Sequence, residues 1–411
     1  MQAMYNIVIS CYYCLIKFAA LFNAKASLWV SGRKKQQIPD LKDEKTIWMH
    51  CSSLGEYEQG KPVFDALRQQ YKNYKYVISF FSPSGYEKMK DKDIADYILY
   101  LPIDLPHKAS EFVNKINPSL SIFVKYDIWY NYLKLLNKSK SIVVFISVLF
   151  DSGHSIFKYY NKILLNELRK TDYIFTQDDN TKSLLEQRNF NNVLFAGDTR
   201  VDRVLAIAKE PYEDDKLKNF CQGNKKILIC GSTWEKDIEK LSAISKMLLA
   251  EYKIVIAPHE ISEHQINYIK NKFINTPIAL YTKYENTDTE KKILIIDTIG
   301  ILSKIYRYGD IAYIGGGFGH GIHNTLEPAA YKLPVIFGPK YKKFNEAKIL
   351  VKNQSFFTYN NISQLEQIFI SLKSEEFYNK AKSGIDSFLK SNQGASKKIL
   401  ETLESKLAIP D

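Results

Sequence analysis

The sequence has few cysteines and histidines, and their spacing fits neither a disulfide framework nor a complete metal site. Its 411 residues contain five cysteines and seven histidines. Cys11 and Cys14 have the spacing of a metal-binding pair, but no second pair and no nearby histidine accompanies them. We therefore interpret them as two small apolar residues on a buried or lipid-facing helix. The odd, scattered count argues against a disulfide scaffold and indicates a reducing compartment.

Low-complexity tracts and short repeats are also absent. Hydrophobic residues make up 45% of the chain and charged residues 25%, which is typical of a folded globular protein. The length suits two domains of about 150–200 residues each. The formal net charge of +12 favours an anionic partner, which is a membrane surface, a phosphorylated substrate or nucleic acid. Because the lysines are scattered, charge alone does not choose among these partners.

The N-terminal segment has one apolar stretch, residues 5–21, close to the lower limit of about 17–20 residues for a spanning helix. It lacks an A-x-A-like cleavage site, so we expect no secretory signal peptide. Trp29 and the basic residues 33–35 follow, as in an interfacial anchor, and this positive charge places the bulk of the protein in the cytoplasm. Because Lys17 interrupts the stretch, three interpretations remain: a short span, a helix lying in the interface, and a buried amphipathic helix of a soluble domain.

From residue 46 onward, short β-branched runs alternate with amphipathic helical segments, which predicts parallel sheets covered by helices on both faces. The polar segment 210–224, with Pro211 and Gly223, separates two series of strands and is predicted to be a linker. The predicted parts are an anchor (1–35), a first domain (36–209), the linker (210–224), a second domain (225–375) and C-terminal helices (376–411). The predicted strands are TIWMHC, YVISFF, YILYLP, LSIFVK, IVVFIS, YIFTQ and VLFAG in the first series and KILICG, KIVIAP, KILIID, IAYIGG and PVIFG in the second.

Ligands of such sheets bind at the carboxyl ends of strands, so the predicted active site lies in a cleft between the two domains. The most specific motif is YIGGGFGHGIHNTLEPAAYKLPVIFGP, residues 313–339. Its glycines, Gly316 and Gly317 among them, let backbone N–H groups approach a ligand closely, and the following helix start favours a phosphate. Asn324 and Thr325 are the two candidate helix caps. Glu327 is a candidate acceptor for a ribose diol.

The stretch TIWMHCSSLGEYEQG, residues 46–60, ends a strand in small residues and then places Gly55 and Glu56 at the start of a helix. Two interpretations of Glu56 remain open. It is either an acid that stabilises the helix N-terminus, or a general base within reach of an acceptor hydroxyl.

Three smaller signals follow strands of the second series, where they could line one pocket. Gly231, Ser232 and Thr233 form a potential phosphate or carboxylate cradle, with a simple helix cap as the alternative. The other two are the residues Pro258 and His259, and the residues Asp297, Thr298 and Gly300. A lone histidine such as His259 is more often structural.

At this point the sequence resembles the 3-deoxy-D-manno-octulosonic acid (Kdo) transferases of lipopolysaccharide synthesis, through most of its length. The motifs that carry the resemblance are MHCSSLGE for H-S-x-S-x-G-E, YLPIDLP followed by NKINPSL, DIWYN for E-L-W-P-N, AGDTRVD, GSTWEKDIE, DTIGIL and above all GGGFGHGIHNTLEPAAYKLPVIFGP. The N-terminal segment ending in basic residues also matches the family.

The resemblance implies an α/β fold of the GT-B class, with two Rossmann-like domains facing a central cleft and a C-terminal helix that packs back on the first domain. It implies inverting transfer of Kdo from CMP-Kdo to a lipid A precursor without a metal or another cofactor. Glu56 corresponds to the family's catalytic base. Ser53, Gly55 and Asp127 would support the acceptor side. The residues implied to bind CMP-Kdo are Ser232, Thr233, Pro258, His259, Thr298, Gly300, Gly316, Gly317, Asn324 and Glu327.

The implied location is the cytoplasmic face of the inner membrane, where the basic surface would meet anionic lipid; no nucleic acid partner is expected.

Three positions depart from the family pattern: the arginine of a Pro-Arg-His turn is missing before His259, Ile301 replaces an acid, and Lys125 replaces another. These departures indicate a divergent branch. Two alternatives are another GT-B-like enzyme that uses a UDP-sugar, as a transferase or epimerase, and a non-catalytic membrane adaptor that keeps the fold.

Overall fold

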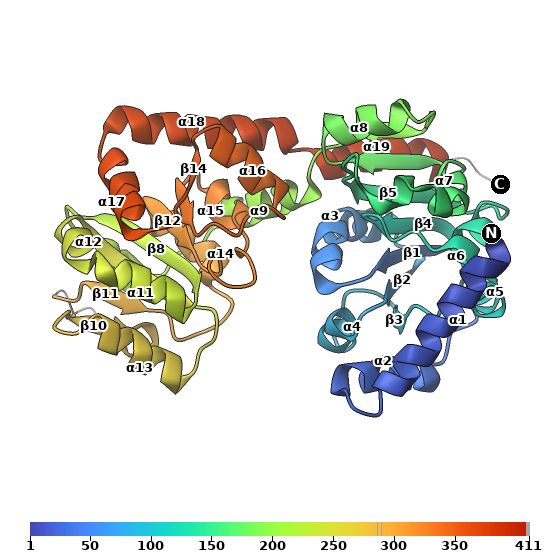
Figure 1. Ribbon diagram of the computed structural model, residues 1–411, viewed down its shortest axis with the longest axis horizontal. Coiled ribbons are helices and arrows are strands. Elements are labelled where there is room, and N and C mark those ends of the chain that lie inside the picture. The colour runs from blue at the N-terminus through green and yellow to red at the C-terminus, as the bar shows by residue number, and fades with distance from the viewer. Residues whose placement is uncertain (286, 289, 408–411) are drawn as a thin grey trace. The chain divides into compact units, whose positions relative to one another are not determined.

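The computed structural model describes residues 1–285, 287–288 and 290–407, which divide into two compact units (Figure 1). Unit 1 comprises residues 1–202 together with 392–407, and unit 2 comprises residues 203–391. The chain leaves unit 1 within α9 (Thr199–Lys209) and returns at the end of α18 (Glu375–Asn392). Each unit is a parallel sheet with helices on both faces, as predicted.

In the described part of unit 1, seven parallel strands have the order β3-β2-β1-β4-β5-β6-β7. All six residues of β1 are buried, which explains its continuous apolar character. The strands are β1 (Thr46–Cys51), β2 (Lys75–Phe80), β3 (Tyr97–Tyr100), β4 (Pro118–Val124), β5 (Ile142–Val148), β6 (Tyr173–Thr176) and β7 (Val193–Phe195). The helices are α1 (Gln2–Ala19), α2 (Ala24–Lys35), α3 (Leu54–Gln70), α4 (Pro83–Met89), α5 (Pro106–Ile116), α6 (Tyr130–Leu136), α7 (Lys162–Leu168), α8 (Asp179–Glu186) and α19 (Ala395–Leu407).

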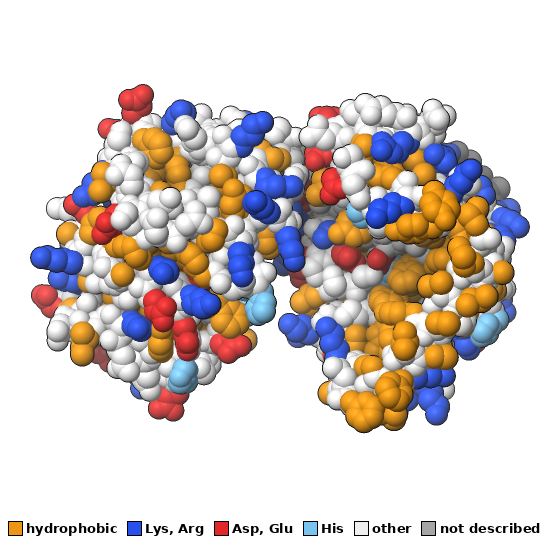
Figure 2. All heavy atoms as spheres, viewed as in Figure 1, with side chains coloured by type: hydrophobic (Ala, Val, Ile, Leu, Met, Phe, Trp, Pro, Cys, Tyr) orange, Lys and Arg blue, Asp and Glu red, His pale blue; other side chains and the backbone are white. Residues whose placement is uncertain are grey.

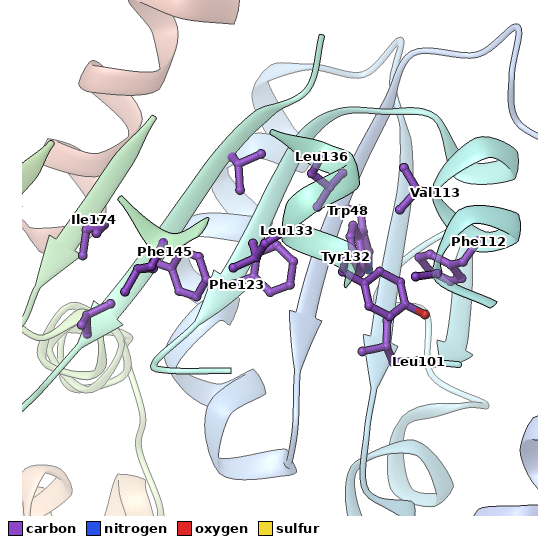
Figure 3. Packing of buried hydrophobic residues seen from close by; sticks show 14 of the residues in the cluster. Trp48, Leu101, Phe112, Val113, Phe123, Tyr132, Leu133, Leu136, Phe145 and Ile174 are labelled. Carbon is purple, nitrogen blue, oxygen red and sulfur yellow. The ribbon is translucent and has the colours of Figure 1, made fainter. Parts of the chain in front are cut away.

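One face of this sheet is covered by an aromatic core (Figure 3). Trp48 of β1 packs against Phe112 of α5, Phe123 of β4 and Tyr132 of α6, with ring centroids 5.1–5.9 Å apart. α5 contributes Phe112 through the regular helical spacing of its buried residues, Ala109, Phe112, Val113 and Ile116. These contacts fix the carboxyl ends of β1 and β4 side by side.

The opposite face includes α19, which buries Ala395, Ile399 and Leu403 in the same cluster as Val63 and Phe64 of α3. Asp202 accepts hydrogen bonds from the N–H groups of Gly394 (2.6 Å) and Ser396 (2.7 Å), which begin this helix. Unit 1 is therefore assembled from two separate stretches of chain.

The described part of unit 2 has seven parallel strands in the order β10-β11-β9-β8-β12-β13-β14. They are β8 (Lys226–Thr233), β9 (Tyr252–Pro258), β10 (Ile278–Leu280), β11 (Ile293–Ile295), β12 (Ile311–Ile314), β13 (Val335–Phe337) and β14 (Phe356–Thr358). The helices not yet given are α10 (Asp215–Cys221), α11 (Glu235–Ala243), α12 (Ser245–Glu251), α13 (Glu263–Lys272), α14 (Leu302–Ile305), α15 (Leu326–Ala330), α16 (Asn345–Lys352) and α17 (Ile362–Ser371).

The domain boundaries differ from the prediction in several places. The predicted anchor, residues 1–35, is part of unit 1, and residues 203–209 of the predicted first domain belong to unit 2. The segment 210–224 is no linker, because it contains α10, whose Leu217 and Phe220 are buried in unit 2. Its polar composition concealed this pair of apolar side chains. In the predicted C-terminal segment 376–411, most of α18 belongs to unit 2, whereas α19 packs on unit 1, as expected for a C-terminal helix that returns to the first domain.

In both sheets the strand order reverses beside the first strand, β1 or β8. β1 pairs with β2 on one side and with β4 on the other, and β8 pairs with β9 and β12 in the same way. Open parallel sheets bind ligands at the carboxyl ends of the strands at such a switch point. The fold therefore predicts one candidate ligand-binding site in each unit, at the carboxyl ends of the strands beside β1 and β8.

Candidate functional sites

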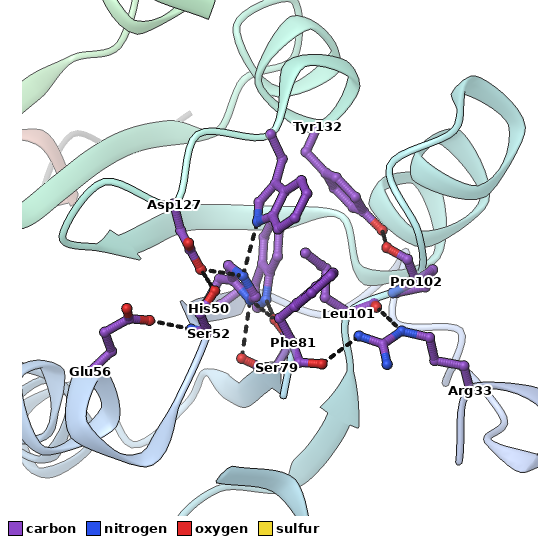
Figure 4. Close-up of polar contacts among 12 residues, drawn as sticks. Arg33, His50, Ser52, Glu56, Ser79, Phe81, Leu101, Pro102, Asp127 and Tyr132 are labelled. Carbon is purple, nitrogen blue, oxygen red and sulfur yellow. Dashed lines mark hydrogen bonds and ion pairs between the residues drawn. The ribbon is translucent and has the colours of Figure 1, made fainter. Parts of the chain in front are cut away.

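The switch point of unit 1 brings together the loops that follow β1 and β4 (Figure 4). Ser52 and Glu56 follow β1, and Asp127 follows β4. Ser52 joins the two carboxylates, because its N–H donates to Glu56 Oε2 and its hydroxyl donates to Asp127 Oδ2. The sequence prediction had placed Glu56 and Asp127 on the same side of the reaction, and the structure brings them together.

Glu56 occupies the first turn of α3, with Ser53 at the N-cap. The pKa of its carboxyl group is raised to about 7, first by burial and then by the charge of Asp127. Lys125 and the N–H groups of Ser52 and Ser53 lower this pKa, but they do not offset the burial. Glu56 therefore lies where a helix start favours a carboxylate, and its raised pKa makes it a stronger base than an ordinary glutamate. Its role as the general base stays a prediction.

Asp127 lies beside a second residue, the ring of His50. The distance from His50 Nε2 to Asp127 Oδ2 is 3.1 Å, and His50 is fully buried. His50 Nδ1 lies 2.9 Å from Ser79 Oγ and 3.1 Å from the carbonyl oxygen of Ser79. Since a carbonyl only accepts, we assign a proton to Nδ1.

The indole of Trp129 completes the support, because its Nε1–H donates to His50 Nε2 at 3.2 Å. Sequence reasoning assigned no role to His50 or Trp129. A signal for His50 was present, because a histidine in the otherwise apolar run TIWMHC requires a buried polar partner. Trp129 was marked only as the tryptophan of the family-like motif DIWYN, which does not indicate a partner for its indole N–H.

A chain of aromatic rings connects this site with the outer face of α1. Tyr12 of α1 stacks on Phe81, with centroids 6.5 Å apart, and Phe81 stacks on Trp129 at 4.8 Å. Beyond Tyr12, α1 exposes a stripe at heptad-like spacing, with Leu15 68% and Phe18 66% exposed. Figure 2 shows hydrophobic side chains gathered over the region of α1. The stripe comprises Met1, Met4, Val8, Cys11, Leu15, Phe18 and Phe22.

The inner face of α1 and the helix α2 pack firmly on unit 1. Tyr5 donates a 2.6 Å hydrogen bond to Asp104, a buried carboxylate whose pKa burial raises to about 6. Trp29 is only 4% exposed. The Arg33 guanidinium lies over its ring, 3.7 Å from the centroid, and donates to the carbonyl oxygens of Leu101 and Phe81. The prediction that Trp29 and Arg33 belong to a surface anchor is therefore wrong for these two side chains, because they are structural contacts inside the unit.

Among the described residues, none of the helices is by itself both long and apolar enough to cross a bilayer. α1 and α2 reach that limit only when taken together, and the chain bends by 118° between them.

The switch point of unit 2 brings together the ends of β8, β9 and β12. Gly315 packs so closely on the end of β8 that an added Cβ would lie 2.2 Å from the carbonyl oxygen of Ser232. Gly316 adopts a φ of +90°, a conformation that favours glycine, and Ser232 adopts a φ of 53°. The residues Ser232, Thr233, Pro258, His259, Gly316 and Gly317 are thus neighbours at one edge of the sheet, as expected for the carboxyl ends of parallel strands.

Asp237 organises these loops from the first turn of α11. Its side chain accepts hydrogen bonds from the N–H groups of Trp234 and Gly316 and from the hydroxyl of Tyr313, each at 2.9 Å. Asp237 is 1% exposed, and burial raises the pKa of its carboxyl group. Sequence reasoning missed Asp237, although an acid three residues after a strand-to-helix turn repeats the spacing of Ser53 and Glu56.

An aromatic stack forms the wall of this site. The ring of His259 stacks on the rings of both Trp234 and His323, with centroids 4.4 Å from each. Trp234 Nε1 also donates to His323 Nε2 at 3.0 Å. Burial and the neighbouring His259 lower the pKa of His323 to about 4, so this ring is neutral at physiological pH. Trp234 and His323 were not predicted as site residues.

Asn324 lies just before the short helix α15, whose N-cap is Thr325, and Glu327 lies in its first turn. Asn324 donates to Glu327 Oε1 at 3.0 Å and accepts from the N–H of Leu326 at 3.0 Å. Burial raises the pKa of Glu327. Thr298 and Gly300 lie in the loop before α14, whose Leu302 would lie 3.2 Å from a Cβ added to Gly231. These four predicted residues thus lie in the segments that follow β11 and β12.

The two Rossmann-like units show the fold of GT-B glycosyltransferases, which confirms the predicted fold class. A UDP-GlcNAc 2-epimerase from Neisseria meningitidis, solved with UDP-GlcNAc bound, is similar with a TM-score of 0.60. It is 15% identical, and the match covers 88% of this chain and all of that one. At this identity the likeness concerns the fold alone.

Residues 28–203 match the model of the family described as 3-deoxy-D-manno-octulosonic-acid transferase (kdotransferase). A bifunctional glycosyltransferase/methyltransferase of Fusobacterium nucleatum is 29% identical across 95% of this chain; the match spans 61% of that relative's length. A 3-deoxy-D-manno-octulosonic acid transferase of Aquifex aeolicus is 26% identical across 78% of this chain and 83% of its own length. The predicted resemblance to the Kdo transferase family is confirmed, and these relatives indicate a glycosyltransferase.

Proposed function

We propose that this protein transfers Kdo from CMP-Kdo to a hydroxyl group of a lipid A precursor in lipopolysaccharide synthesis. The proposal draws its substrates from the names of the relatives and the family resemblance. The observation that carries the chemistry is the Glu56 carboxylate, half-buried beside Asp127 with a pKa raised to about 7. A base of this strength is matched to proton removal near neutral pH.

In the proposed reaction, the acceptor oxygen forms a bond to the anomeric carbon of Kdo as the bond from that carbon to the CMP phosphate breaks. Glu56 takes the proton of the acceptor hydroxyl, and CMP leaves with the bonding electron pair. Attack opposite to the leaving group inverts the configuration. Asp127 positions Ser52 and sustains the basicity of Glu56 through its negative charge. The reaction needs no metal or other cofactor in this scheme.

In unit 2, the loops at the ends of β8, β9 and β12 would bind the donor, with Glu327 toward the ribose and Ser232 and Thr233 toward the phosphate. The exposed stripe of α1 would lie in the cytoplasmic surface of the inner membrane as an interfacial helix, since its inner face is already packed on unit 1. The rings of Tyr12 and Phe81 continue this apolar surface as far as Trp129. This surface would guide an amphipathic acceptor toward Glu56.

The test is CMP release from CMP-Kdo with a lipid A precursor, comparing the natural protein with Glu56→Gln. We expect turnover to fall about 10²–10⁴-fold in Glu56→Gln while CMP binding is retained. Glu44→Gln, in an exposed loop just before β1, is the matched control and should keep full activity. Equal activity in all three proteins would leave Glu56 as a helix-start acid only. Tighter binding of UDP than of CMP would favour the UDP-sugar alternative.

A further inference from the structure

A cavity lies in unit 1, away from the carboxylates Glu56 and Asp127, where α1, α2 and α5 meet. Its volume is about 910 Å³, which is within the range of small-molecule sites. Its walls also include Pro102 and Ile103 from the loop after β3. Five cationic side chains from the three helices line it, namely Lys17, Arg33, Lys34, Lys108 and Lys115.

The positive charge of this cavity is largely unbalanced. Glu111 is the one acidic side chain in its described lining, and it already pairs with Lys108 at 3.4 Å and with Lys115 at 3.2 Å. One carboxylate therefore faces five cations. Like charges gathered around a concave surface repel one another, and an anion bound among them removes that repulsion.

Arg33 is the fixed member of the group. Three of its N–H donors are used by the carbonyl oxygens of Leu101, Trp29 and Phe81. In the part of the chain that the structure describes, no carboxylate pairs with it. A guanidinium has five N–H donors, so two remain after these bonds. The position of Arg33 does not depend on a ligand, because the rings of Trp29 and Tyr100 and the three carbonyls already fix it.

We propose that this cavity binds a phosphate ester. A fixed guanidinium with spare donors suits the oxygens of a phosphate group, and lysines on flexible stems can close around the remaining charge. The ester arrives either as the headgroup of an anionic phospholipid or as a small soluble molecule. The cavity shares α1 with the exposed apolar stripe, yet it is separate from the site of Glu56 and Asp127.

The experiment compares the full-length protein with the double variant Lys34→Gln/Lys108→Gln. Both side chains are exposed at the cavity, so the fold should be kept, and the melting temperature checks this. The matched control is Lys72→Gln/Lys140→Gln, which removes the same charge from exposed positions of unit 1 outside the cavity. Binding of glycerol 3-phosphate is measured by calorimetry. Binding to vesicles is measured by co-sedimentation, with phosphatidylcholine alone and with added phosphatidylglycerol.

We expect the cavity variant to bind at least tenfold more weakly than the control. A loss confined to phosphatidylglycerol vesicles, or shared by both ligands, identifies a lipid headgroup site. A loss confined to glycerol 3-phosphate identifies a site for a soluble ester. If the cavity variant and the control bind alike in both measurements, the proposal is overturned. CMP binding is expected to stay unchanged throughout, so the result is independent of the proposed transfer reaction.

Discussion

Glu56 and Asp127 are bonded to the same residue, Ser52, one through its backbone N–H and the other through its hydroxyl. Two carboxylates held this close cannot ionise independently, because each charge disfavours the other. The arrangement therefore couples the basicity of Glu56 to the charge of its neighbours. This coupling makes the assignment of the base testable by pH.

The first prediction concerns the acid limb of the pH–rate profile. With a Glu56 pKa of about 7, kcat/KM should fall below neutral pH, and at pH 6 it should be about a tenth of its plateau. Asp127→Asn removes a charge that raises this pKa, so the limb should move to lower pH. Lys125→Gln removes a charge that lowers it, so the limb should move to higher pH. Limbs that stay in place in both variants would show that another group titrates.

The second prediction concerns stability and needs no substrate. The folded-state pKa of Glu56 lies above its ordinary value of 4.5, so the folded state binds the proton more tightly than the unfolded state does. The stability that this group contributes is present below about pH 4.5 and is lost as the pH rises through 7. Glu56→Gln does not undergo this loss. Relative to the variant, the natural protein should lose about 1–3 kcal/mol between pH 5 and 8, at about 1.4 kcal/mol per pKa unit.

Thermal unfolding of both proteins across this pH range measures the effect. Glu44→Gln is again the control, because its side chain is exposed. A constant difference in melting temperature between the natural protein and Glu56→Gln would mean that Glu56 titrates normally.

The third prediction concerns Asp237. Asp237→Ala removes the acceptor of the N–H groups of Trp234 and Gly316 and of the Tyr313 hydroxyl, which should destabilise unit 2 by about 3–5 kcal/mol and weaken CMP binding. Asp237→Asn should cost only about 1 kcal/mol, because an amide oxygen can keep both N–H bonds while the hydroxyl turns to accept. Denaturant unfolding and CMP titration of the two variants provide the comparison. Equal losses would show that the charge, rather than the bonds, is essential.

The fourth prediction concerns the stripe on α1. Leu15→Glu/Phe18→Glu places two charges on the exposed apolar face, and it should reduce binding to vesicles of pure phosphatidylcholine at least tenfold. Tyr159→Glu, at an 86% exposed position elsewhere in unit 1, is the control. Activity toward a soluble acceptor analogue should persist in both. Unchanged sedimentation of the double variant with vesicles would remove α1 from the proposed membrane surface.

Much of the fold could be predicted because its strands are buried on both faces and read as continuous apolar runs. Each of the twelve predicted strands overlaps an observed strand, and TIWMHC coincides with β1. The strands β10 and β14 were missed because each has only three residues at a sheet edge. Leu217 and Phe220 were missed because polar neighbours surround them in sequence. Trp29 and Arg33 were misread because composition does not reveal which side of a helix packs.

The sequence predicts those parts of the candidate sites in which the backbone conformation restricts the residue type. The glycine loop and the turn before Glu56 are visible because close approaches and helix starts restrict the residue type. The supporting partners were not visible, since His50 meets Trp129 across 79 positions of sequence and Trp234 meets His323 across 89. Such contacts depend on strand order, and nothing in the local pattern encodes them.

The pairing of Asp202 with the start of α19 bears on how the protein is made. A ribosome releases residues 1–202 well before residues 395–407, so the sheet of unit 1 emerges with the face around Val63 and Phe64 still uncovered. The intervening residues of unit 2 form a continuous stretch that has its own core and can fold meanwhile. Unit 1 must therefore wait during synthesis with an open apolar surface. Nascent chains stalled before residue 395 should bind chaperones more than chains that already include α19.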